Sequence, residues 1–131
     1  MKDKITIEAG AFIVIVLYLM LMPFSWVCAM VLAGTAHELG HCIALYLFGE
    51  PILDIRIGPF GAKIETMPMD EGRTILCALA GPLAGLIVCL FWRWIPKTAF
   101  LAFAQSVFNL LPVYPLDGGR VLRAARLLRK G

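Results

Sequence analysis

The sequence predicts an all-α membrane protein with about four transmembrane helices, a small amphipathic β-hairpin between the second and third of them, and a short basic C-terminal helix. Of its 131 residues, 60% are hydrophobic and 16% are charged, whereas soluble domains carry about 25% charged residues. Residues 9–49 contain only Glu38 among Asp, Glu, Lys and Arg, and the ranges 74–92 and 98–116 contain none. Such runs fit helices that cross a bilayer, because a helix pairs its backbone polar groups internally.

The same composition argues against several other classes of protein. A disordered chain, a basic nucleic-acid-binding domain and a disulfide-stapled secreted module all differ from this sequence in polarity or cysteine usage. We therefore expect a lipid bilayer around the chain and no nucleic acid among its partners.

The first uncharged run is too long for one span and contains Pro23, which predicts a tight reversal between two helices. A signal peptide is the competing interpretation of the first helix, but Glu8 and the lack of a clear small-residue cleavage site before Pro23 argue against it. The runs and their breaks predict five helices in a single domain covering residues 1–131: residues 7–22, 25–48, 73–92, 98–111 and 118–129.

Residues 52–67 predict the hairpin. Hydrophobic and polar residues alternate on both sides of a turn between Gly58 and Gly61, which is typical of two amphipathic strands. An exposed strand edge here could pair with an unwound substrate segment. A hairpin that only covers the bundle explains the pattern equally well.

The distribution of basic residues predicts the topology. Four spans place both termini on one side, where ten basic residues would face only Arg93 and Lys97 on the other side. The ten are Lys2, Lys4, Arg56, Lys63, Arg73, Arg120, Arg123, Arg126, Arg129 and Lys130. The positive-inside rule then predicts a multi-pass membrane protein with both termini cytoplasmic. For the C-terminal arginines, anchoring at anionic headgroups is favoured over a specific ligand site.

Both histidines of the protein lie in the second predicted helix, in the sequence HELGH. His37 and His41 are one turn apart and stack on one helix face, where two imidazoles can hold one Zn²⁺. Glu38 lies beside that face and could take a proton from metal-bound water. The alternative is structural, with these polar side chains forming hydrogen bonds between helices.

A zinc hydrolase needs a third protein ligand and an open position for water. Asp117 is the candidate, because Pro112 and Pro115 break the fourth helix just before it and Gly118 follows it. The competing interpretation makes Asp117 the N-cap of the last helix. In combination with the histidine pair, the ligand interpretation is favoured.

These segments resemble the site-2 protease family of intramembrane zinc metalloproteases. The resemblance rests on HELGH at 37–41, on NLLPVYPLDGG at 109–119, which is close to the sporulation-type branch, and on ALAGPLAG at 78–85. It implies that His37, His41 and Asp117 bind zinc, that Glu38 is the general base and that Asn109 contacts the substrate backbone. An asparagine in a span is also a common hydrogen-bonding residue between helices.

The family resemblance implies a zinc metalloendopeptidase that cuts a transmembrane or membrane-associated protein. A sigma-factor precursor or an anti-sigma factor is the expected substrate, in regulated intramembrane proteolysis. A regulatory membrane protein or a second copy of the chain is an expected partner. Sporulation-type relatives usually continue into further spans, whereas this sequence ends 12 residues after Gly119, which bears on substrate gating. Two alternatives remain: a catalytically inactive metal-binding partner protein, and a small ion or proton transport subunit.

Overall fold

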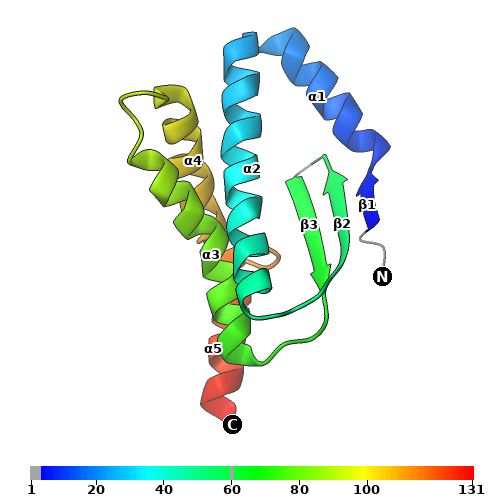
Figure 1. The fold of residues 1–131 in the computed structure, drawn as a ribbon, viewed down its shortest axis with the longest axis vertical. Coiled ribbons are helices and arrows are strands. Elements are labelled where there is room, and N and C mark those ends of the chain that lie inside the picture. The colour runs from blue at the N-terminus through cyan, green and yellow to red at the C-terminus, as the bar shows by residue number, and fades with distance from the viewer. Residues whose placement is uncertain (1–3, 60) are drawn as a thin grey trace.

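The computed structural model describes residues 4–59 and 61–131, so Lys2 of the predicted basic set lies outside the described residues. The chain is mostly helical, with a small sheet inserted between helices (Figure 1). The elements are β1 Lys4–Ile7, α1 Ala9–Leu21, α2 Phe24–Leu47, β2 Ile52–Gly58, β3 Gly61–Thr66, α3 Glu71–Cys89, α4 Pro96–Asn109 and α5 Asp117–Lys130. The predicted helical fold with a hairpin between the second and third helices is confirmed.

Local signals set the helix ends. Pro23 separates α1 from α2, and it is the residue that immediately precedes α2. The side chain of Asp70 accepts a hydrogen bond from the backbone N–H of Arg73 at 3.0 Å, so α3 begins two residues before its predicted start. Pro96 occupies the first turn of α4, where its missing N–H has no helical partner to lose.

Helix α3 lies at the centre of the bundle and packs against α2, α4 and α5 (Figure 1). Glycines allow these close approaches. A Cβ at Gly40 of α2 would lie 2.7 Å from the Cβ of Ala84, and one at Gly85 of α3 would overlap the Ser106 hydroxyl of α4. Small residues at helix contacts are typical of packing within membranes.

The buried core consists mainly of small side chains, whereas the large hydrophobic side chains face outward. Ala33, Ala78 and Ala102 are no more than 1% exposed. In contrast, Ile43 is 57% and Tyr46 is 83% exposed. This distribution is the reverse of a water-soluble fold and favours a lipid environment.

Within the described residues, two helices are long and apolar enough to cross a membrane, namely α2 and α3. Helix α1 has 13 residues and α4 has 14, which corresponds to about 20 Å each. A span of the hydrocarbon core needs about 20 residues. Length and composition therefore support two of the four predicted spans.

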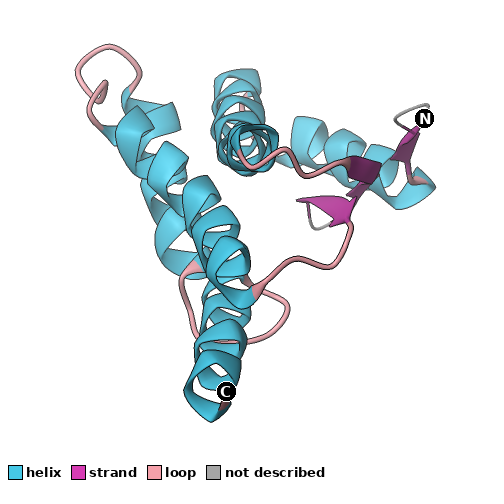
Figure 2. Cartoon of the chain, turned by 60° about the horizontal axis from the view of Figure 1, so that its bottom comes forward, coloured by secondary structure: helices cyan, strands magenta, loops and turns pink. Residues whose placement is uncertain are grey.

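The sheet contains three strands in the order β1-β2-β3, with β1 parallel and β3 antiparallel to β2. The hairpin was predicted, but the pairing of β1 was missed because a four-residue strand leaves only Ile5 and Ile7 as an alternating pattern. Strand β1 covers one edge of β2, so β3 provides the uncovered edge of the hairpin among the described residues. Figures 1 and 2 both show the sheet beside α2, on the side away from α3 and α4.

Candidate metal centre

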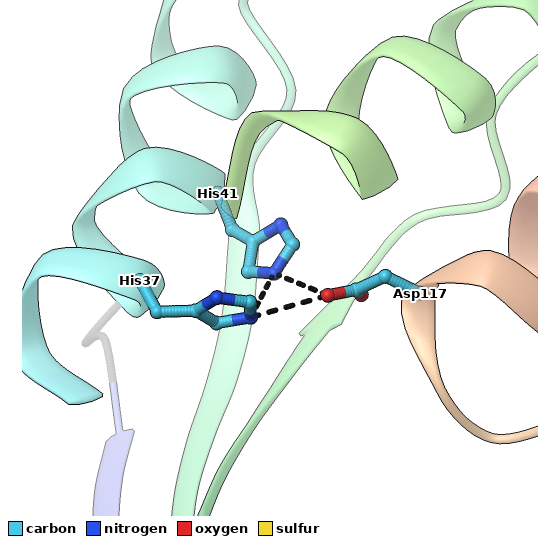
Figure 3. Close-up of side chains that lie close together, drawn as sticks. All are labelled: His37, His41 and Asp117. Atoms are coloured by element: carbon cyan, nitrogen blue, oxygen red, sulfur yellow. Dashed lines mark hydrogen bonds and ion pairs between the residues drawn. The ribbon is translucent and has the colours of Figure 1, made fainter. Parts of the chain in front are cut away.

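Two helices place three polar side chains together inside the bundle (Figure 3). His37 and His41 project from one face of α2 and are 3% and 9% exposed. Asp117, which is 6% exposed, reaches them from the first turn of α5, although it lies 80 residues from His37 in sequence. The structure thus brings together all three residues that were predicted as metal ligands.

The three facing atoms form a nearly equilateral triangle. The Oδ2 atom of Asp117 lies 3.1 Å from Nε2 of His37 and 3.3 Å from Nε2 of His41, and the two Nε2 atoms are 3.2 Å apart. Ligands at about 2.0–2.1 Å from a tetrahedral zinc ion lie about 3.3–3.4 Å from one another. The triangle therefore fits one face of a zinc coordination tetrahedron, which leaves a fourth position for water.

The carboxylate of Asp117 does not cap α5. The N-cap position belongs to Leu116, and no side chain accepts a capping hydrogen bond there. Oδ2 of Asp117 faces the histidines, while Oδ1 lies 3.8 Å from the guanidinium of Arg120. The N-cap interpretation of Asp117 is wrong, because the side chain points across the bundle toward α2.

Helix α3 holds the ring of His41. Its Nδ1–H donates to the backbone carbonyl of Cys77 at 2.7 Å, which leaves Nε2 free to face the triangle. A Cβ at Gly81 would overlap this ring, so a residue without a side chain is needed there. Pro82 has no N–H to donate to the carbonyl of Ala78, so α3 lacks one helical hydrogen bond next to Cys77.

The second ring is held differently. Nδ1 of His37 is buried and has no hydrogen-bond partner among the described residues. The orientation of His37 therefore depends on its Nε2 contacts with Asp117 and His41.

Glu38 lies beside the triangle on α2 and is partly buried. The position is consistent with the predicted role of Glu38 as a base, which stays a prediction.

Asn109 is the last residue of α4 and lies outside the triangle. Its side-chain N–H donates to the backbone carbonyl of Gln105 at 2.9 Å, within its own helix. The predicted contact with a substrate is not tested by this geometry.

Three supporting groups were missed at the level of sequence: the Cys77 carbonyl, Gly81 and the Arg120 guanidinium. A signal existed for one of them, since Gly81 and Gly85 are four residues apart within an apolar helix, a spacing typical of close helix contacts. Every residue has a backbone carbonyl group, so the residue types in a sequence do not indicate which carbonyl accepts such a hydrogen bond.

The chain is similar in sequence to two zinc metalloproteases, one of them putative, and to a sporulation protein. A zinc metalloprotease of Methanocaldococcus jannaschii is 28% identical over 134 residues, which cover 86% of this chain and 39% of that protein. A putative zinc metalloprotease of Synechocystis is 30% identical over 105 residues, covering 68% of this chain and 28% of that protein. Stage IV sporulation protein FB of Bacillus subtilis is 26% identical over 137 residues, covering 76% of this chain and 44% of that protein. No family model matches.

The structural comparison extends over nearly the whole chain. The site-2 protease from Methanocaldococcus jannaschii matches 97% of this chain and 68% of that chain, with a TM-score of 0.73 and 25% identity. In sequence and fold, this chain is similar to zinc metalloproteases and to a site-2 protease. It spans less than half the length of the three curated relatives, so it corresponds to part of each of those proteins.

Proposed function

We propose that this site-2 protease homologue is the catalytic core of an intramembrane zinc metalloprotease. The observation that carries the proposal is the triangle of His37, His41 and Asp117 inside a bundle with an apolar exterior. The zinc metalloproteases among its relatives support the same conclusion.

In this proposal the two Nε2 atoms and Oδ2 of Asp117 hold the ion. Zinc, when bound, supplies a coordinated water with a pKa of about 7 and polarises the scissile carbonyl group. The chain's own contribution is to orient these ligands: the Cys77 carbonyl holds His41, and Arg120 lies next to the second oxygen of Asp117.

Glu38 is the proposed general base. Its carboxylate accepts a proton from the attacking water and returns it to the nitrogen of the leaving amine, as the peptide C–N bond breaks. Its place next to His37 on α2, with the side chain partly exposed, supports this role.

The proposed topology has four membrane segments, with α1 and α4 inserted beside α2 and α3. The apolar surface of α1 supports this, since Ile13 is 68% and Met20 is 79% exposed. Trp92 and Trp94 near the α3–α4 connection are typical of a membrane interface. The opposite end, which carries basic α5, is then cytoplasmic, with both termini on that side.

The proposed substrate is a transmembrane or membrane-associated protein. A sigma-factor precursor is the narrower proposal, and the likeness to a sporulation protein supports it. A helical substrate must unwind before cleavage, because its peptide groups are paired within the helix. Asn109 is proposed to contact the unwound backbone, with its side-chain oxygen available as an acceptor.

The uncovered edge of β3 is the proposed docking strand. The pair Gly58–Gly61 closes the hairpin, and pairs alternate along a ladder between hydrogen-bonded and non-hydrogen-bonded. Ala62 and Ile64 are therefore non-hydrogen-bonded with respect to β2, and their backbone N–H groups point to the free edge. These groups can pair with an extended substrate.

Co-expression with single-span candidate substrates tests the proposal. We expect Glu38→Gln to abolish cleavage while zinc content stays at the level of the native chain, because the change removes a base and spares the ligands. Glu8→Gln is the matched control, since Glu8 is exposed at the start of α1. Equal cleavage by the native chain and Glu38→Gln would exclude the catalytic role of Glu38, and absence of zinc from the native chain would exclude the metal site.

A further inference from the structure

Helix α5 carries five basic residues, and the proposed catalysis assigns a role to only one of them, Arg120. Arg120 lies near Asp117, but Arg123, Arg126, Arg129 and Lys130 form no ion pair with any carboxylate among the described residues. Unpaired cations on one short helix attract anions of high charge density.

Three of these cations line one side of a hollow of about 400 Å³ between α5 and the segment that follows α4. Arg123, Arg126 and Lys130 lie on its α5 side, which also contributes Leu122. Tyr114, which is 67% exposed, forms part of the opposite wall. A volume of this size is within the range of small-ligand sites.

The lining combines charge with apolar surface. Guanidinium groups pair with phosphate oxygens through two parallel hydrogen bonds. Leu122 and Leu127 offer apolar contact, and a tyrosine suits a membrane interface. A phosphate group that carries a hydrocarbon body complements both parts of this lining.

We propose that the hollow between α5 and Tyr114 binds the phosphate headgroup of an anionic phospholipid. The cytoplasmic leaflet is the source of such lipids, and the excess of basic residues places α5 on that side. Gly119 also lines the hollow, two residues after Asp117. A bound lipid therefore holds the first turn of α5, which presents Asp117 to the histidines.

Lipid retention measured by native mass spectrometry tests the proposal. The full chain, purified in neutral detergent, is mixed with equal amounts of phosphatidylglycerol and phosphatidylcholine. We expect it to retain phosphatidylglycerol in preference. Arg126→Gln should lower this retention about fivefold, as expected for one arginine at an anionic surface.

Arg129→Gln is the matched control, because Arg129 is exposed on the same helix with the same charge and does not line the hollow. It should change retention little. Equal loss in both variants would overturn the proposal in favour of diffuse attraction. Equal retention of the two lipids, or displacement of phosphatidylglycerol by inorganic phosphate, would also overturn it. Zinc content and circular dichroism verify that the variants are folded, independently of proteolysis.

Discussion

Gly81 of α3 lies directly against the imidazole of His41 on α2, so that a Cβ at position 81 would overlap the ring atoms, including Nε2. The Cys77 carbonyl, one turn earlier on α3, accepts a hydrogen bond from Nδ1 of the same ring. Together the two contacts orient the ring, with Nε2 facing Asp117 at 3.3 Å. The third helix, which contributes no ligand, thus determines where one ligand atom lies.

We expect Gly81→Ala to displace His41 and lower zinc affinity about 10–100-fold, the usual effect of disturbing the groups that orient a ligand. Zinc content after dialysis against buffered metal measures this. Gly34→Ala is the matched control, because nothing lies within 4 Å of a Cβ at Gly34. Native zinc affinity in Gly81→Ala would contradict the role assigned to Gly81.

Zinc should stabilise the folded chain, because the triangle of ligands exists only when α2 and α5 are both packed against α3. Free zinc at 100 times its dissociation constant adds about 2.7 kcal/mol. We expect thermal unfolding in detergent to shift upward with zinc and back with a chelator, and Asp117→Asn to lose the shift. Asp70→Asn should keep it, since asparagine also caps a helix. A zinc-dependent shift that persists in Asp117→Asn would argue against Asp117 as a ligand.

Ile64→Pro should reduce cleavage while zinc stays bound, because proline removes an N–H group from the free edge of β3 and leaves the pairing with β2 intact. Ile55→Pro tests the integrity of the sheet and not its free edge. Ile55 pairs with Ile5 of β1, so proline there disturbs the centre of the sheet. Product bands from a co-expressed substrate measure both effects. Undiminished cleavage by Ile64→Pro would exclude substrate pairing along β3.

Ser106→Ala should destabilise the bundle by about 0.6 kcal/mol, the average measured for hydrogen bonds between membrane helices, and by no more than about 1.7 kcal/mol, the maximum. The Ser106 hydroxyl is fully buried and donates to the carbonyl of Pro82 at 3.0 Å. Ser25→Ala, which removes an exposed contact with Lys97, should have little effect. Unfolding in mixed micelles compares the two. An equal loss of stability would show that the Ser106 contact contributes nothing specific.

The histidine pair could be predicted because its geometry is local. Residues four apart in a helix share a face whatever surrounds them, and the break at Pro23 follows from the missing N–H of proline. The pairing of β1 with β2 could not be predicted in this way. It joins Lys4–Ile7 to a strand about 50 residues later, and four residues carry too little pattern to indicate a partner.

The sequence by itself determined that the chain is apolar and helical, that His37 and His41 face one way, and that prolines interrupt the chain before Asp117. Only the tertiary structure decided that the Asp117 carboxylate turns away from its own helix end toward the histidines, and that α3 holds one of them. The physical reason is that backbone periodicity sets directions within one helix. The distance and rotation between helices depend instead on how closely glycines such as Gly40 and Gly85 let them pack.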